Sequence, residues 1–175
     1  MSNPKPDKPR RRRRWLSRVG EVLLFVALFA GVRAWTGRAV AQGPAPAIEG
    51  QALDGRPLSL AGYRGEPVLV HFWASWCSVC RLEEGSIQKL AAAGEHRVIT
   101  VATGSGDAAK VAGYLKSKGL AFPTLVDEDG ELGEAFGVTG LPTTFVVGPD
   151  GVIRFAEVGF TTRFGMLARL WWAGR

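Results

Sequence analysis

The centre of the chain contains the stretch Val68-Leu69-Val70-His71-Phe72-Trp73-Ala74-Ser75-Trp76-Cys77-Ser78-Val79-Cys80. Its first six residues are almost continuously apolar, as in a strand that is buried on both faces of a sheet. The residues from Cys77 to about Ala93 predict a helix, and Gly94 is its expected stop. The two cysteines therefore lie where a buried strand ends and a helix begins.

This position gives the cysteines a predicted chemistry. The first N–H groups of a helix lack partners and carry about half a positive charge. That charge stabilises a thiolate and lowers the pKa of Cys77 below the usual value of about 8.5. Cys80 lies one turn further on, so we expect Cys77 to be the exposed, attacking thiol. Cys80 would then resolve the mixed disulfide, and the pair predicts disulfide exchange.

Metal binding is the main alternative for the two cysteines. Soft thiolates suit copper(I), and His71 is a possible further ligand. A structural zinc site needs four ligands, but the only histidines are His71 and His96. The sequence also has no Gly-rich phosphate loop. We therefore expect no resident metal and no cofactor other than a redox-active disulfide between Cys77 and Cys80.

The segments around this stretch predict one small α/β domain over residues 48–175. A strand, a helix and a second strand in that order imply a parallel pair with a right-handed crossover. A hairpin near the end is antiparallel, so we expect a mixed central sheet with helices on both faces and strand 68–73 at its centre. Trp73, Trp171 and Trp172 are expected to pack in the core or at its edge. The other expected elements are a hairpin over 48–60, strands 97–102 and 122–126, helices 107–118, 131–136 and 162–172, and hairpin strands 143–147 and 152–158.

The basic charge of the chain lies before this domain. Residues 1–38 carry ten Lys/Arg and two Asp/Glu, whereas residues 39–175 carry twelve and fourteen. The net charge of +6 therefore comes from the N-terminal segment, and the domain itself is slightly acidic. A nucleic-acid-binding domain needs a basic face on its own fold, so we expect no nucleic-acid partner.

The N-terminal segment predicts targeting to a membrane. Residues 1–18 form a basic tail that we expect on the cytoplasmic side, and Val22–Val32 is an uninterrupted apolar run. An uncleaved transmembrane anchor over residues 19–36 is the favoured interpretation, because a helix from Trp15 to Trp35 would span about 30 Å.

A cleavable signal is the alternative interpretation of the same segment, with Ala39-Val40-Ala41 as its small-residue cleavage site. The run Arg12-Arg13-Arg14 also loosely matches a twin-arginine export signal. Each interpretation leaves the domain across the membrane from the basic tail. Residues 37–47 then form a linker, rich in Pro and Gly from Gln42 onward.

Two stretches resemble the thioredoxin family. Residues 68–80 resemble its active-site strand and helix start, and Gly137-Val138-Thr139-Gly140-Leu141-Pro142-Thr143-Thr144-Phe145 resembles its cis-proline loop. Residues 54–60 are similar to the TlpA/ResA-like, membrane-anchored bacterial branch. Residues 80–86 most resemble the suppressor-of-copper-sensitivity D type. The resemblance covers Ile48 to the C-terminus and implies a thioredoxin-like fold.

The resemblance implies roles for several further residues. Pro142 would be cis and face the disulfide, and Gly140 and Leu141 would offer a backbone edge to an extended substrate. Trp76 would form an apolar rim for docking. Glu83 matches a glutamate that lies near the active site in the TlpA/ResA-like proteins, and we expect it to exchange a proton with Cys80.

His71 departs from the family pattern, since thioredoxin has Asp at this position and TlpA-like proteins often have Asn. It is either a buried core residue or a proton acceptor for Cys80, because imidazole titrates near neutrality. Ser78 and Val79 also differ from the thioredoxin pair Gly-Pro, so the direction of electron flow stays open.

The resemblance also implies where the protein works and with which partners. We expect a single-pass protein of the bacterial inner membrane, with its catalytic domain in the periplasm. Its substrates would be protein thiols and disulfides, and a DsbD-like transmembrane donor would supply electrons. As a reductant it would serve cytochrome c maturation or the repair of copper-damaged proteins. The alternative function is a copper or zinc metallochaperone that uses the same cysteines.

Overall fold

The computed structural model describes residues 18–28, residue 31 and residues 41–175. The chain divides into two units, Met1–Thr36 and Gly37–Arg175. Residues 18–28 form a helix, and its large apolar side chains between Val22 and Leu28 are exposed. Within the described residues, no helix is both long enough and apolar enough to cross a membrane. The predicted tail over 1–17, both tryptophans that flank the expected anchor, and residues 39–40 of the expected cleavage site lie outside the described residues.

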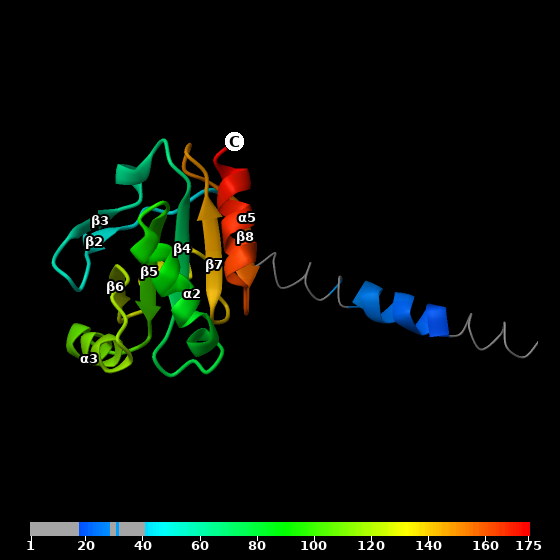
Figure 1. Ribbon diagram of the computed structural model, residues 1–175, viewed down its shortest axis with the longest axis horizontal. Helices are drawn as coiled ribbons and strands as arrows, with labels where there is room; N and C mark the ends of the chain where they lie inside the picture. Colours follow the sequence, from blue (N-terminus) through cyan, green and yellow to red (C-terminus); the bar gives the residue numbers. More distant parts are fainter. Residues whose placement is uncertain (1–17, 29–30, 32–40) are drawn as a thin grey trace, which may run out of the picture. The chain divides into compact units, whose positions relative to one another are not determined.

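A six-stranded mixed sheet forms the centre of the second unit (Figure 1). Strand β4 (Val68–Trp73) is completely buried and pairs in parallel with β5 and antiparallel with β7. This confirms the predicted central position of residues 68–73. The strand order is β1-β8-β7-β4-β5-β6, with β1 at Gly43–Pro44, β5 at Arg97–Thr103, β6 at Thr124–Asp127, β7 at Thr143–Val147 and β8 at Val152–Val158.

The helices cover both faces of this sheet. The side chains of Leu69 and Trp73 pack with those of α2, α3 and α5, whereas Val70 and Phe72 pack with Phe136 at the end of α4. This alternation follows from the two-residue period of a strand and places His71 on the same face as Leu69 and Trp73. Trp73 is buried, as predicted. The helices are α2 (Cys80–Ala93), α3 (Ala108–Lys118), α4 (Glu131–Ala135) and α5 (Arg163–Ala173).

Two short strands precede the central sheet as a separate hairpin. Strands β2 (Glu49–Gln51) and β3 (Pro57–Ser59) are antiparallel, as the Asp54-Gly55 turn predicts. A single helical turn, η1 (Ala61–Tyr63), connects the hairpin to the central sheet. Strand β1 lies in the segment that the sequence assigns to a linker, and it pairs with Val152 and Ile153 at the edge of β8.

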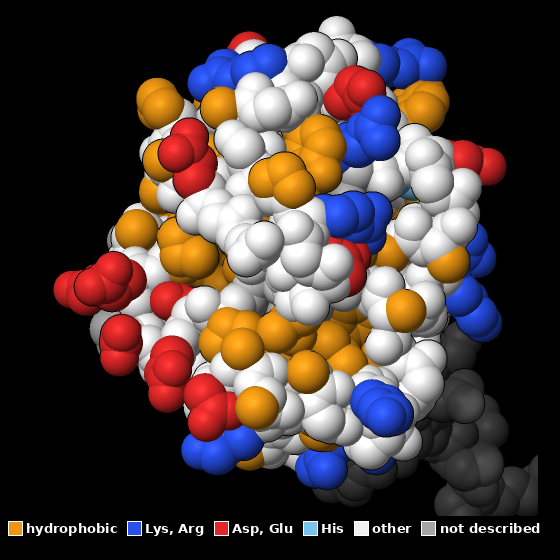
Figure 2. All heavy atoms as spheres, turned by 90° about the vertical axis from the view of Figure 1, so that its left-hand side faces the viewer, with side chains coloured by type: hydrophobic (Ala, Val, Ile, Leu, Met, Phe, Trp, Pro, Cys, Tyr) orange, Lys and Arg blue, Asp and Glu red, His pale blue; other side chains and the backbone are white. Residues whose placement is uncertain are grey.

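The strand register separates the two ends of the domain. Val68 of β4 pairs with Val147, so the β7–β8 turn at Pro149 and Asp150 lies beyond the start of β4. The cysteines follow the other end of β4, beyond Trp73. The face beside β6 and α3 carries acidic side chains along one side, with basic ones scattered over the rest (Figure 2).

Candidate active site

Cys77 and Cys80 form a disulfide directly after the central strand, with their Cα atoms 5.3 Å apart. The N–H of Cys77 donates to the carbonyl oxygen of Ala74 at 3.1 Å, which closes a tight turn after β4. Helix α2 begins at Cys80, so the predicted start at Cys77 is wrong by three residues. The reason is this turn, which holds residues 74–79 outside the helix.

The sulfur of Cys77 nevertheless lies at the helix start. The N–H of Cys80, the first residue of α2, donates to Cys77 Sγ at 3.1 Å. Cys77 is 6% exposed and Cys80 is 1% exposed. The predicted order of exposure is confirmed, but the expectation of an openly exposed Cys77 is wrong for this disulfide-bonded state.

Glu83 is completely buried one turn after Cys80. Its Oε1 accepts a hydrogen bond from the N–H of Thr161, in the loop between β8 and α5. Its Oε2 has no hydrogen-bond partner among the described residues. Burial raises the pKa of Glu83 to about 7, although the Thr161 hydrogen bond acts in the opposite direction. This carboxyl group can therefore gain or lose a proton near neutral pH.

His71 lies beside Glu83 on the inner face of β4. Its Nδ1 is 2.9 Å from Thr144 Oγ1 on β7 and 3.8 Å from Glu83 Oε2. Burial lowers the pKa of His71 to about 3, so its imidazole is neutral at pH 7. The contact with Glu83 is therefore a contact between a neutral ring and a titrating carboxyl group.

The loop before β7 contains Gly140, Leu141 and Pro142, three further residues that the sequence predicted for the site. The Leu141–Pro142 peptide bond is cis, as expected. The carbonyl oxygen of Pro142 accepts from the N–H of Gly159 at 2.7 Å, and Gly140 O accepts from the Thr143 hydroxyl at 2.7 Å. Leu141 packs against the core cluster that includes both cysteines. The cis-proline loop and the disulfide therefore share one apolar cluster.

Trp76 is 65% exposed beside the disulfide. Its indole Nε1–H donates to the carbonyl oxygen of Gly104, 2.9 Å away in the loop after β5. The neighbouring N–H of Ser75 donates to Ser105 Oγ at 3.0 Å. These bonds hold an exposed apolar ring in a fixed place at the site, which fits the rim predicted for this residue.

A family model for the AhpC/TSA family matches residues 41–156, which is more than half of the chain. The chain belongs to the AhpC/TSA family.

Relatives in this group carry thiol chemistry in their names. The thiol:disulfide interchange protein DsbE of Yersinia pestis is 39% identical over 120 residues, which cover 66% of this chain and 63% of that protein. The thiol-disulfide oxidoreductase ResA of Bacillus thuringiensis is 28% identical over 103 residues, which cover 58% of this chain and 60% of that protein. The chain thus spans less than two thirds of the length of these two relatives.

A solved structure extends the similarity over the whole domain. A thiol:disulfide interchange protein of the thioredoxin family from Chlorobium tepidum is 29% identical, with a TM-score of 0.65. The match covers 77% of this chain and 98% of that one. These relationships confirm the thioredoxin-like α/β fold. The Cys77–Cys80 disulfide fits the thiol–disulfide chemistry that the names of these relatives carry.

Sequence reasoning missed two members of the site. Thr144 lies within the proline-loop motif but was given no role, and Thr161 lies outside both motifs. Thr144 faces His71 because the β4–β7 register pairs these two residues. Thr161 reaches Glu83 because α2 packs against α5. Both contacts join segments that are far apart in the sequence, so no local pattern predicts them. Among the described residues, no three His, Cys, Asp or Glu side chains are grouped as metal ligands.

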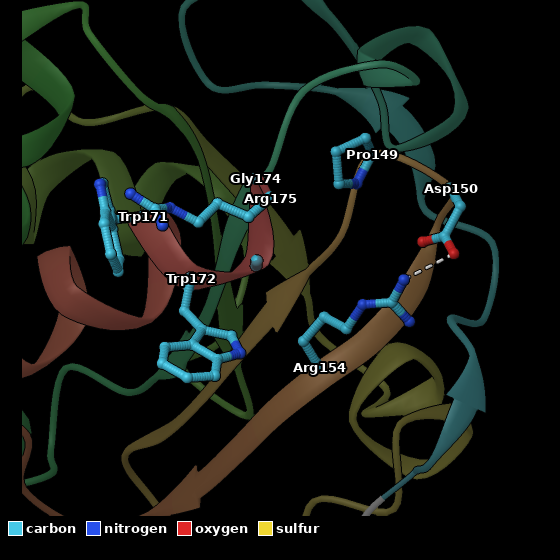
Figure 3. Close-up of a pocket in the computed structure, with 8 residues that line it drawn as sticks. Pro149, Asp150, Arg154, Trp171, Trp172, Gly174 and Arg175 are labelled. Carbon is cyan, nitrogen blue, oxygen red and sulfur yellow. Dashed lines mark hydrogen bonds and ion pairs between the residues drawn. The ribbon is translucent and has the colours of Figure 1, made fainter.

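A second surface feature lies at the other end of the domain. A cavity of about 620 Å³ is lined by Pro149, Arg154, Trp171 and Trp172, among others (Figure 3). The sequence predicted that these tryptophans pack in the core or at its edge. They are 56% and 67% exposed, so the core part of that prediction is wrong. Met166, Leu170 and Ala173 occupy the inner face of α5, which leaves the tryptophans on its outer side.

Proposed function

We propose that the domain reduces disulfides in protein substrates, with Cys77 as the attacking sulfur and Cys80 as the resolving sulfur. The observation that carries this assignment is the Cys80 N–H that donates to Cys77 Sγ at the start of α2. A donor at a helix N-terminus stabilises negative charge on the sulfur that it contacts. Cys77 is also the less buried of the two sulfurs, so a substrate reaches it first.

The proposed reaction is two successive thiol–disulfide exchanges. The Cys77 thiolate attacks one sulfur of the substrate disulfide, and the other substrate sulfur leaves as a thiolate that takes up a proton. The Cys80 thiolate then attacks Cys77 Sγ and releases the second substrate thiol. The substrate gains two electrons and two protons, and the Cys77–Cys80 disulfide forms. This chemistry needs no organic cofactor or metal, because both electrons come from the two sulfurs.

Glu83 is the proton acceptor that we assign to Cys80. It lies one turn further along the same buried face of α2, and its pKa of about 7 suits proton exchange at neutral pH. His71 is a poor acceptor, because burial keeps its ring neutral down to a pKa of about 3. We assign His71 a positioning role, in which its ring limits the orientations open to the Glu83 carboxyl group.

Substrate binding is assigned to the loop before β7 and to Trp76. In this proposal, Gly140 and Leu141 pair with an extended substrate by strand addition, and Pro142 shapes that edge. The fixed, exposed indole of Trp76 supports its proposed role as the apolar rim. A Pro142→Ala variant with unchanged exchange rates toward protein disulfides would contradict this part of the proposal.

The cellular setting is also part of the proposal. We infer a periplasmic domain on a single-pass inner-membrane anchor, recycled by a DsbD-like donor and closest to the suppressor-of-copper-sensitivity D type. The apolar run from Val22 and the residues 80–86 support this setting. Its substrates would be proteins of cytochrome c maturation or proteins damaged by copper. N-terminal sequencing of the mature protein tests the anchor, since a start at Gln42 would exclude it.

A glutathione redox titration of the Cys77–Cys80 couple tests the direction of electron flow. A reductant is expected near the value of about −270 mV known for thioredoxin, whereas a value near about −120 mV would mark an oxidant and overturn the proposal. The same purified protein tests the metallochaperone alternative. Stoichiometric copper or zinc without insulin reduction would favour that alternative.

A further inference from the structure

Exposed apolar side chains are concentrated around the disulfide. In residues 41–175, the structure describes seven exposed large hydrophobic side chains, of which five lie in segments that adjoin the site. Two of these five, Trp76 and Val79, belong to the turn before α2. The other three are Leu82 at 69% exposure, Phe160 at 54% and Phe164 at 81%. Leu82, Phe160 and Phe164 are called the apolar ridge below.

The hydrogen bond between Glu83 and Thr161 brings the segments of the apolar ridge together. Leu82 precedes Glu83 in the first turn of α2, and Phe160 precedes Thr161 in the loop before α5. Phe164 follows in the first turn of α5, which packs against α2. The N–H of Gly159 also bonds to the carbonyl oxygen of Pro142, so the same loop adjoins the proposed substrate edge. The segments that carry the apolar ridge therefore adjoin both helix α2, which begins at Cys80, and the proposed substrate edge.

Two arginines without ion pairs flank the apolar ridge. Arg81 precedes Leu82, and Arg163 precedes Phe164; both are exposed, and neither forms an ion pair with any described residue. Elsewhere in the domain, ion pairs with carboxylates hold the guanidinium groups of Arg56, Arg97, Arg154 and Arg169. Exposed positive charges without an ion pair beside an apolar surface favour a partner with an apolar centre and acidic flanks.

We propose that the apolar ridge, with Arg81 and Arg163, docks the polypeptide segment next to the reacting disulfide of a protein substrate. That segment carries large apolar residues close to its cysteine and Asp or Glu on either side of them. Aromatic and aliphatic side chains that are exposed at a functional site are typical anchors of a protein interface. This inference rests on the proposed function, because it names the substrate class of the same disulfide.

Two disulfide peptides of equal length would test the docking. One carries Phe and Leu beside its cystine and Glu at its ends, and the other carries Ser and Lys at the same places. The reduced full-length protein should react about 30-fold faster with the first peptide, as a few interface anchors can provide. The triple variant Leu82→Ala, Phe160→Ala, Phe164→Ala should reduce this preference to less than about threefold, since the anchors are gone.

Two further variants separate the contribution of the arginines from that of the apolar side chains and control for the loss of exposed aromatic rings. Arg81→Glu with Arg163→Glu is measured on two further pairs of peptides, one differing only in the end charges and the other only in the residues beside the cystine. It should reverse the preference for Glu over Lys at the peptide ends while keeping the preference for Phe and Leu. Trp171→Ala with Trp172→Ala is the matched control, because it removes two equally exposed aromatic rings at the other end of the domain and should keep the full preference. Oxidised glutathione serves as a small disulfide that reports the reactivity of Cys77 in each protein.

The outcomes distinguish failure of the docking from failure of the function. A triple variant that keeps the peptide preference would overturn the docking proposal. Vesicle binding and self-association of the wild type and the triple variant test the other occupants. If the triple variant loses either property but keeps the peptide preference, the apolar ridge binds a membrane or a second copy, and the docking proposal is overturned. A wild-type protein that reacts with oxidised glutathione but has no peptide preference also overturns the docking alone. No reaction with either kind of disulfide would refute the proposed function itself.

Discussion

Exposed aromatic side chains lie at both ends of the central strand β4, but only one end holds reactive groups. At the end that follows Trp73, Trp76 and the apolar ridge surround the Cys77–Cys80 disulfide. At the other end, Gly174 lies against Pro67, and Trp171 and Trp172 line an open cavity (Figure 3). Both surfaces carry exposed aromatic side chains, so exposure alone does not mark the site.

The polar groups beneath each surface make the difference. At the reactive end, Glu83 and His71 are buried, and burial raises the pKa of Glu83 to about 7 and lowers that of His71 to about 3. At the other end, Arg154 pairs with Asp150 at 2.7 Å in the open, and the Arg175 guanidinium lies 3.6 Å from the centre of the Trp171 ring. Strongly shifted pKa values gather at functional sites, whereas satisfied surface charges do not need a function.

Cysteine substitution should give the largest contrast between the two ends. Cys77→Ser removes the attacking sulfur, so turnover of insulin disulfides should fall by at least about 1000-fold. Cys80→Ser keeps one round of attack but cannot resolve it, so mixed disulfides with substrates should accumulate on non-reducing gels. Trp171→Ala, at the other end, should turn over insulin at the wild-type rate. Comparable loss in the tryptophan variant would remove the distinction between the ends.

The sequence predicts the central strands well because their signals are local. The apolar stretch 68–73 and the hairpin around Pro149-Asp150-Gly151 predict β4, β7 and β8 with the bounds that the structure has. Helix α2 begins three residues later than predicted, at Cys80 instead of Cys77. The turn that holds Cys77 depends on a hydrogen bond to Ala74, which composition does not reveal. Helix bounds depend on individual hydrogen bonds, whereas strand positions depend on a repeating pattern.

The contacts that tune the site are not predictable in this way. Glu83 is identified by resemblance, but its burial and its hydrogen bond to Thr161 follow from the packing of α2 against α5. The outward position of Trp171 and Trp172 was open to prediction, because the spacing of the buried residues in α5 already selects one helix face. Local periodicity therefore gives the elements, and tertiary packing sets the electrostatics.

The pH dependence of stability should also separate the ends. Burial raises the pKa of Glu83 from 4.5 to about 7 and lowers that of His71 from 6.5 to about 3. Between pH 4.5 and 6.5, the folded pair therefore holds one proton on Glu83, and the unfolded pair holds one on His71. Because the two proton counts match, the pair adds little pH dependence to the wild type in this window.

Single substitutions should reveal the opposite effects of the two residues on how the free energy of unfolding changes with pH. In His71→Asn, the folded state keeps the Glu83 proton in this window and the unfolded state has lost it. The free energy of unfolding therefore falls as pH rises. In Glu83→Gln, the unfolded state binds a proton at His71 in this window and the folded state does not. The free energy of unfolding therefore falls as pH decreases. Each slope should approach about 1.4 kcal/mol per pH unit in urea unfolding of the oxidised protein.

Two control proteins test whether the pH dependence comes from Glu83 and His71. The double variant His71→Asn with Glu83→Gln removes both groups and should return to the shallow wild-type profile. Asp150→Asn acts at the other end, where nearby hydrogen bonds lower the pKa of an exposed carboxyl group, so it should add no slope in this window. Wild-type profiles in both single variants would show that the buried pair does not titrate as described.

The smallest predicted effect concerns α5, which connects the two ends. The Thr162 hydroxyl caps this helix by accepting from the N–H of Gly165 at 3.1 Å, and Thr162→Ala should cost about 1 kcal/mol of stability. The neighbouring Thr161 N–H holds Glu83, and this bond lowers the pKa of that carboxyl group. A looser loop should therefore raise the Glu83 pKa further and move the pH profile of turnover upward.

Thr162→Ser keeps the capping oxygen and should restore both the stability and the pH profile. Hydrogen exchange should locate the change, with faster exchange at Thr161 and Gly165 and wild-type rates at Leu170 and Ala173 near the other end of α5. A uniform increase along the whole helix would mean that the cap supports general stability only. Helix α5 runs from the reactive end of the domain to the other end. An effect confined to its first turn would therefore show that the pKa of Glu83 can change without a change at the other end.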